Sequence, residues 1–174
     1  MSRGMIHYYF GDGKGKTSAA LGLAMRMAGY GDVVIVQFLK NTQSGELLTL
    51  QKLDNITVLR GKAGEAFTCD MTEEEMRLTE GIHEKNLLAG MKLSQSPDCR
   101  LLVLDEADDA VALGVLNEEL LKKAILEKPE HLELVVTGHK PLSWIVNAAD
   151  YITEMKKYRH PYDKGIAARE GVEY

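Results

Sequence analysis

The segment that most constrains the fold is GDGKGKTS at residues 11–18, because it separates two segments of contrasting pattern. The apolar run at 5–10 is typical of a short buried strand, and residues 16–29 carry apolar side chains at helical spacing. A glycine-rich turn between a strand and a helix lets backbone N–H groups converge on phosphate oxygens, and the helix N-terminus adds positive potential. The segment therefore predicts a phosphate-binding loop, and with it an ATP site.

The residue types within this loop have distinct expected roles. Lys16 is expected to reach the phosphates, and the Thr17 hydroxyl to bind Mg²⁺. The loop is shorter than the usual pattern, since three residues rather than four separate Gly11 from Gly15. The competing interpretation is a turn that binds nothing, which the correctly placed Gly-Lys-Thr disfavours. The residues expected to bind the nucleotide are Gly11, Asp12, Gly13, Lys14, Gly15, Lys16, Thr17 and Ser18.

The rest of the chain alternates between strand-like and helix-like segments. Further strands are expected at 32–39, 56–59, 100–105, 132–137 and 151–155, and further helices at 46–53, 72–94, 116–127 and 143–149. This order implies an α/β fold with a mostly parallel central sheet and helices on both faces. No repeat, low-complexity run or long linker divides the sequence, so residues 1–174 are expected to form a single nucleotide-binding domain.

A second motif, LLVLDE at residues 101–106, joins four apolar residues to two carboxylates. In phosphate-loop proteins a carboxylate at the end of a neighbouring strand lies beside Mg²⁺, and ligands collect at the carboxyl ends of parallel strands. Asp105 and Glu106 are therefore expected to bind the metal. The alternative is that Asp105 caps the next helix while Glu106 is solvated. Asp108 and Asp109 are expected only to begin that helix.

Charge and cysteine content exclude several classes of protein. The formal net charge is −5 and the basic residues form no stripe, which disfavours nucleic acid and anionic membranes as partners. No apolar stretch approaches the roughly 20 residues that cross a bilayer. The cysteines, Cys69 and Cys99, have neither metal-ligand spacing nor a framework of pairs, as is typical of a reducing cytoplasm. We therefore expect a cytoplasmic protein.

Further motifs follow the loop in order along the chain. They are VVIVQFLK at 33–40 with Gly45-Glu46 after it, Gly64 with Phe67-Thr68, VLDE at 103–106, Thr137-Gly138, ADYITEM at 149–155, HPYDKGI at 160–166, Ala168, and GVEY at 171–174. With the shortened loop, this series resembles the ATP:corrinoid adenosyltransferases of the phosphate-loop type, which make adenosylcobalamin. Because the matches cover almost the whole chain, they are more specific than a phosphate loop alone. The resemblance implies a P-loop NTPase fold of the RecA-like kind.

The resemblance also implies a reaction. Reduced Co(I) of a corrinoid, such as cob(I)yrinic acid a,c-diamide, attacks the ribose C5′ of ATP and expels the whole triphosphate. Lys14, Lys16, Mg²⁺ and the loop amides are then expected to neutralise the departing triphosphate, and Arg26 to contact the phosphates. Glu106 is expected to bind Mg²⁺ or the ribose. Lys16, Glu106 and Phe67 are the residues expected to carry catalysis.

For the corrinoid, the resemblance implies that Phe67 presses on the lower face of the corrin ring and displaces an axial ligand. Cys69 stands where the family usually has a Trp beside this pocket, and His139 stands where the family has an Arg. An electron donor for cobalt and a homodimer are implied as well. Two other interpretations stay open: a RecA-like ATPase or ATP-dependent regulatory switch with Glu106 as general base, and a non-catalytic corrinoid- or ATP-binding module.

Overall fold

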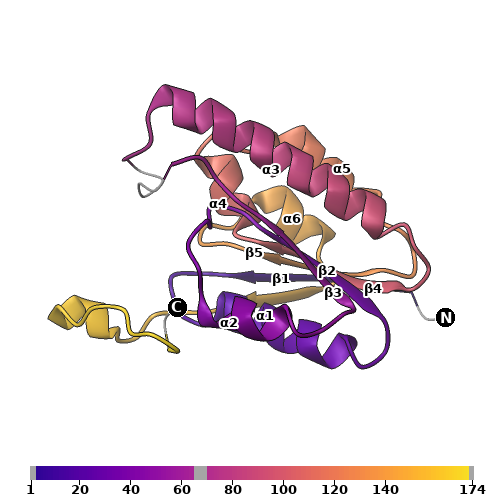
Figure 1. The fold of residues 1–174 in the computed structure, drawn as a ribbon, viewed down its shortest axis with the longest axis horizontal. Coiled ribbons are helices and arrows are strands. Elements are labelled where there is room, and N and C mark those ends of the chain that lie inside the picture. Colours follow the sequence, from indigo (N-terminus) through magenta and orange to yellow (C-terminus); the bar gives the residue numbers. More distant parts are fainter. Residues whose placement is uncertain (1–2, 65–69, 173–174) are drawn as a thin grey trace.

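Within residues 3–64 and 70–172, which the computed structural model of this chain describes, six strands form one parallel sheet (Figure 1). The strands are β1 (Ile6–Phe10), β2 (Asp32–Gln37), β3 (Ile56–Arg60), β4 (Cys99–Asp105), β5 (Glu133–Thr137) and β6 (Tyr151–Glu154), in the spatial order β3-β2-β4-β5-β1-β6. Every neighbouring pair runs parallel. The predicted α/β class is therefore confirmed.

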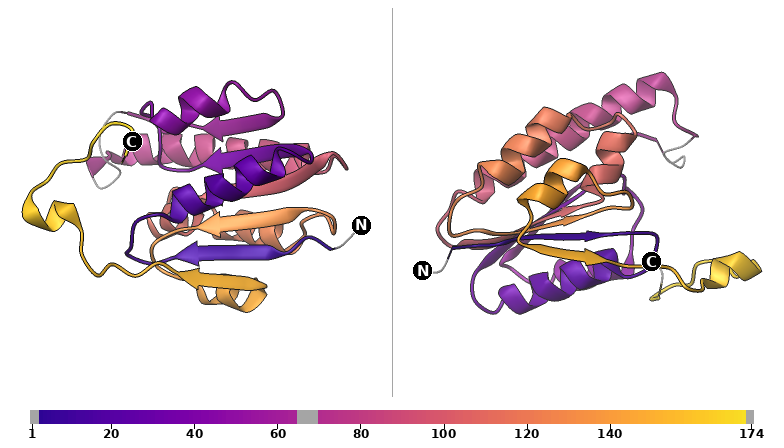
Figure 2. Two further views of the ribbon diagram at one scale, coloured as in Figure 1. Left: turned by 90° about the horizontal axis from the view of Figure 1, so that it is seen from below. Right: turned by 180° about the vertical axis from the view of Figure 1, so that it is seen from behind.

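Helices cover both faces of this sheet, as predicted (Figures 1 and 2). One face carries α1 (Lys16–Met27) and α2 (Gly45–Leu50). The other carries α3 (Glu73–Leu93), α4 (Ala107–Ala112), α5 (Glu118–Leu126) and α6 (Ser143–Ala148). The short α4 is an addition to the elements that the sequence predicts. The long α3 begins at a capping box, in which the Glu75 N–H donates to Thr72 Oγ1 at 3.2 Å.

Alternation along the strands builds a separate core on each face. In β2, Val33 and Ile35 pack in the core beneath α1, whereas Val34 and Val36 belong to the core beneath α3 to α6. Because both faces are covered, the strand is apolar at successive positions instead of alternating with polar residues.

The register places the carboxyl ends of three strands at one edge of the sheet. β5 lies between β1 and β4, where Leu134 is in register with Ile6 on one side and with Leu102 on the other. Asp105 at the end of β4 and Thr137 at the end of β5 therefore reach the same edge as the loop that follows β1. This edge is where ligands bind in sheets of this kind.

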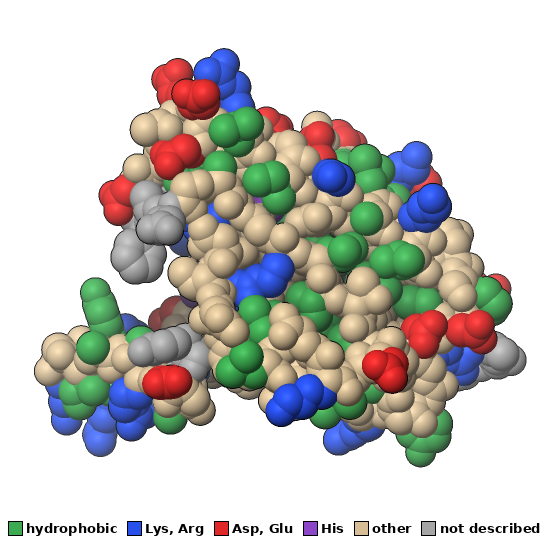
Figure 3. All heavy atoms as spheres, viewed as in Figure 1, with side chains coloured by type: hydrophobic (Ala, Val, Ile, Leu, Met, Phe, Trp, Pro, Cys, Tyr) green, Lys and Arg blue, Asp and Glu red, His purple; other side chains and the backbone are tan. Residues whose placement is uncertain are grey.

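After β6 the chain leaves the body of the molecule. Residues 156–159 and 161–172 are exposed, and only residues 161–164 form a short 3-10 helix, η2 (Pro161–Lys164). Figure 3 shows this tail standing off from the body, with Lys and Arg side chains gathered along it. Its last described residue, Val172, returns to line the pocket considered below. Among the described residues, the helices are all too short or too polar to cross a membrane.

Candidate functional site

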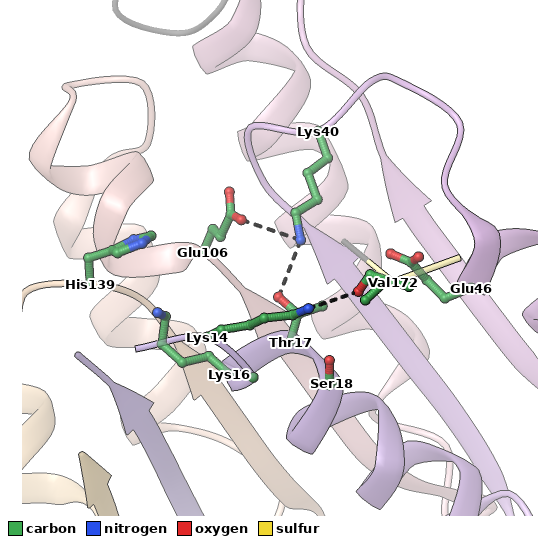
Figure 4. Close-up of a pocket in the computed structure, with 10 residues that line it drawn as sticks. Lys14, Lys16, Thr17, Ser18, Lys40, Glu46, Glu106, His139 and Val172 are labelled. Carbon is green, nitrogen blue, oxygen red and sulfur yellow. Dashed lines mark hydrogen bonds and ion pairs between the residues drawn. The ribbon is translucent and has the colours of Figure 1, made fainter. Parts of the chain in front are cut away.

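A pocket of about 310 Å³ opens at the carboxyl edge of the sheet, around the start of α1 (Figure 4). It is lined by Lys14, Gly15, Lys16, Thr17, Ser18, Lys40, Glu46, Glu106, His139 and Val172. The first four N–H groups of a helix have no partner inside that helix, and α1 begins in this wall. The pocket therefore combines unpaired backbone donors with three lysine side chains, a combination suited to a polyanion.

The glycine-rich loop is held in place by the chain segments after β5 and β6. Gly13 N donates to Met155 O at 2.6 Å, and Gly11 N donates to His139 O at 3.2 Å. Gly11 has φ +116° and Gly15 has φ +114°, in the left-handed region that favours glycine. A Cβ at Gly11 or Gly13 would also collide with the Met155 carbonyl. These two N–H groups thus shape the loop, and the donors left for phosphate are those nearer the helix.

Asp12 links the glycine-rich loop to the segment that follows β6. Its Oδ1 accepts a hydrogen bond from the Lys157 N–H at 2.9 Å, which holds the pKa of the exposed Asp12 carboxyl below its usual value. The contact joins the loop to the first residues of the tail. Asp12 therefore helps to hold the shape of the loop, and its expected contact with the nucleotide stays a prediction.

Lys16 is buried beneath the loop that it follows. Lys16 is only 8% exposed, and its Nζ donates to Gly11 O at 2.7 Å and to Gly13 O at 2.9 Å. The Lys14 side chain extends across the pocket mouth instead, where its Nζ donates to Val172 O at 3.1 Å (Figure 4). The two lysines therefore approach the same space from its inner and outer sides.

Asp105 is the centre of a buried hydrogen-bond network behind the pocket. Its Oδ1 accepts from Thr17 Oγ1 at 2.9 Å and from Thr137 Oγ1 at 2.7 Å. Its Oδ2 accepts from Lys40 Nζ at 2.7 Å and from Gln37 Nε2 at 3.3 Å. A carboxylate has about four acceptor positions, so these donors occupy all of them. Asp105 therefore positions Thr17 and Lys40, and its expected contact with the metal stays a prediction.

Glu106 turns its carboxylate into the pocket through an unusual backbone conformation. It is one of two non-glycine residues with positive φ among the described residues, at φ 61° and ψ 30°. Its N–H donates to Thr137 Oγ1 at 2.9 Å, which holds this conformation. Burial raises the pKa of the Glu106 carboxyl, and the nearby Lys40 ammonium opposes that shift.

Thr17 and Glu106 fit the donor set of a Mg²⁺ ion that also binds phosphate. Mg²⁺ in such sites takes a hydroxyl and one or two carboxylates together with substrate oxygens, and keeps several waters. Across residues 3–64 and 70–172, no group of three or more His, Cys, Asp or Glu could hold a metal by itself. The space between Thr17 and Glu106 suits a positive charge, because the Lys40 ammonium lies 3.3 Å from both Thr17 Oγ1 and Glu106 Oε1.

The other residues expected at the site have different locations. Arg26 lies exposed in the last turn of α1, ten residues beyond Lys16 and hence about 15 Å along the helix, so the structure does not bring it to the pocket. Phe67 and Cys69 lie outside the described residues.

Four lining residues were not among those expected: Lys40, Glu46, His139 and Val172. His139 stands where the family that this sequence resembles has an arginine. Its Nδ1 lies 2.8 Å from Asp109 Oδ2, and this contact holds the ring. Lys40 ends the VVIVQFLK motif directly after a buried strand, which is the signal that could have identified it. Val172 is distant in sequence, and its place in the GVEY motif at 171–174 is the signal that could have identified it.

Asp108, expected only to begin a helix, is buried next to this site. Tyr8 Oη donates to Asp108 Oδ2 at 2.6 Å and itself accepts from the Leu142 N–H at 3.1 Å. Asp108 Oδ1 is buried against the backbone of Gly138 and has no hydrogen-bond partner among the described residues. Burial raises the pKa of Asp108 to about 7 from an ordinary value of 3.8.

We expect Asp108→Asn to make stability rise more, or fall less, than in the wild type as the pH increases from about 4 to 7. The folded protein keeps the Asp108 proton up to about pH 7, whereas the unfolded chain releases it near pH 3.8. In the wild type this group therefore makes folding progressively less favourable as the pH rises through that window. Urea unfolding at several pH values measures the slope, with the exposed Glu119→Gln as control. An unchanged slope in Asp108→Asn would contradict the assignment.

Known proteins are similar in sequence to almost the whole of this chain. The family model described as "ATP:corrinoid adenosyltransferase BtuR/CobO/CobP" matches residues 2–174. A corrinoid adenosyltransferase of Pseudomonas aeruginosa is 33% identical over 174 residues, covering 99% of this chain and 84% of that protein. Corrinoid adenosyltransferases of Escherichia coli K12 and of Salmonella typhimurium are each 30% identical over 175 residues, covering 99% of this chain and 86% of theirs.

Proposed function

This chain belongs to the ATP:corrinoid adenosyltransferase family, and we propose that it transfers the 5′-deoxyadenosyl group of ATP to the Co(I) centre of a corrinoid. The observation that carries the proposal is the pocket at the carboxyl edge of the sheet. There a phosphate loop, three lysines and the Glu106 carboxylate meet in a chain that matches the family from residue 2 to residue 174. The reaction belongs to the biosynthesis of adenosylcobalamin.

In this reaction the protein binds and orients ATP and stabilises its leaving group. The bond formed joins cobalt to C5′, and the C5′–O bond breaks with its electron pair leaving on the triphosphate. Cobalt is thereby oxidised from Co(I) to Co(III). Lys14, Lys16 and the N–H groups at the start of α1 are arranged to neutralise the charge that develops on the triphosphate.

We further propose that Thr17 and Glu106 hold Mg²⁺ together with the phosphates, while Asp105 fixes the Thr17 hydroxyl from behind. The ion would add positive charge next to the leaving triphosphate. His139 lies in the same wall and presents a shorter side chain than the arginine usual at this position. It is suited to a contact with the nucleotide through Nε2, because Nδ1 is engaged by Asp109.

Several finer assignments extend this proposal. The corrinoid is cob(I)yrinic acid a,c-diamide, and a separate electron donor reduces its cobalt. Phe67 and Cys69 form part of the corrinoid pocket. The chain acts as a single domain and as a homodimer in the cytoplasm. The single-domain assignment is supported by one sheet whose strands come from both ends of the chain, and the others follow from the resemblance and the cysteine content.

We expect Glu106→Gln to slow adenosyl transfer by about tenfold to a hundredfold, because the proposed Mg²⁺ beside the leaving triphosphate loses its anionic ligand. The wild type should form triphosphate and release almost no inorganic phosphate when the corrinoid is omitted. Glu46→Gln, which changes another carboxyl group of the pocket wall, should have a smaller effect. Rapid phosphate release without corrinoid, abolished by Glu106→Gln, would instead favour an ATPase in which Glu106 activates water.

A further inference from the structure

A lysine ammonium group lies among the oxygen atoms at the inner end of the nucleotide pocket. Lys40 Nζ is 3.3 Å from both Glu106 Oε1 and Thr17 Oγ1 (Figure 4). It is also 2.7 Å from Asp105 Oδ2. These groups include the hydroxyl and the carboxylate that we propose as Mg²⁺ ligands. Lys40 is thus in the place where a divalent cation would contact both.

The backbone before Lys40 adopts a conformation that directs this side chain into the pocket. Leu39 has φ 60°, a left-handed conformation that costs energy for a non-glycine residue and persists only where its surroundings enforce it. Its N–H donates to His83 Nε2 at 3.1 Å, and His83 Nδ1 pairs with Val115 O at 2.9 Å. His83 is completely buried and packs edge-on against Phe38. A buried contact therefore fixes the turn that directs Lys40 from the end of β2 into the pocket.

Charge explains why a cation is needed at this position. Asp105 is fully buried and Glu106 is mostly buried, so their neighbouring carboxylates repel each other unless a positive group lies between them. Lys40 supplies that group, and its own side chain is only 24% exposed. A Mg²⁺ ion in contact with Thr17 and Glu106 would lie too close to the Lys40 ammonium for both cations to remain.

We propose that Lys40 is the resident cation of this site in the nucleotide-free protein and exchanges with the Mg²⁺ that ATP brings. On binding of the Mg²⁺–nucleotide complex, the Lys40 ammonium turns from the carboxylates to the triphosphate, which lies in the same pocket. The inference rests on the proposed function for the identity of the incoming nucleotide. The competition between lysine and metal is a property of the side chains alone.

The proposal predicts weak binding of divalent ions in the absence of nucleotide, and stronger binding once Lys40 is neutralised. Mn²⁺ is the probe, because its paramagnetic resonance signal separates free from bound ion. In nucleotide-free protein we expect Lys40→Met to bind Mn²⁺ about tenfold more tightly than the wild type, or better, which is a change of about 1.4 kcal/mol. Lys40→Arg keeps the positive charge and should bind Mn²⁺ as weakly as the wild type.

Lys14→Met is the matched control, because it removes one positive charge from the same pocket at the wall near Val172. Equal Mn²⁺ affinity in the wild type and Lys40→Met would overturn the proposal, and so would an equal gain in Lys14→Met. If Lys40→Met is partly unfolded, millimolar Mn²⁺ should restore the wild-type circular dichroism, and failure to restore it would count against the exchange. Since no ATP or corrinoid is present, these results are independent of whether adenosyl transfer occurs.

Discussion

Lys16→Ala is expected to lower the affinity for ATP by about tenfold to 150-fold while leaving the sheet folded. A hydrogen bond from a charged donor contributes about 1.5–3 kcal/mol, which corresponds to that range. The structure adds a second reason, because Lys16 Nζ also joins the Gly11 and Gly13 carbonyls and so holds the shape of the loop. Titration calorimetry with ATP measures the change.

The control for this experiment is Lys14→Ala. Lys14 also lines the pocket, but its Nζ donates to Val172 O in the tail, whereas Lys16 Nζ donates to two carbonyls of the glycine-rich loop. We therefore expect a smaller loss of ATP affinity for this variant. ATP affinity that is unchanged in Lys16→Ala would contradict the assignment of residues 11–18 as a phosphate loop.

Asp105→Ala is expected to lower the free energy of unfolding by about 3–5 kcal/mol, the usual cost of removing one partner of a buried ion pair. Thr17, Thr137 and Gln37 would lose their acceptor at the same time. Denaturant unfolding without nucleotide measures this loss. Glu106→Ala serves as control, because its carboxylate is partly exposed and accepts from fewer groups. A loss in Asp105→Ala no larger than in Glu106→Ala would show that Asp105 is not the centre of the network.

The sequence predicts those parts of the fold that depend on local pattern. The apolar run before the glycine-rich loop forms β1, and the capping box at Thr72 begins α3. Such features depend on residues close in the chain, so periodicity and turn chemistry are sufficient to find them. The meeting of Glu106 with Thr17 was also predicted, because parallel strands bring their carboxyl ends to one edge of the sheet.

The roles of Lys40, Asp105 and Asp108 depend on contacts that no local pattern contains. Asp105 accepts four hydrogen bonds from residues as distant as Thr17, so its position behind the pocket follows from the order of the strands. Asp108 lies two residues after the acidic motif and resembles a solvated helix start in sequence. It is buried because Tyr8 of β1 and Gly138, which directly follows β5, close over it.

The central claim is that this pocket drives adenosyl transfer, and the products of one turnover test it most directly. The purified protein is mixed with ATP, Mg²⁺ and a chemically reduced Co(I) corrinoid, and loss of the Co(I) absorbance is followed while the phosphate products are separated. We expect one triphosphate for each cobalt–carbon bond formed, and no products from ATP without the corrinoid. Unchanged Co(I) absorbance, or inorganic phosphate in place of triphosphate, would contradict the account.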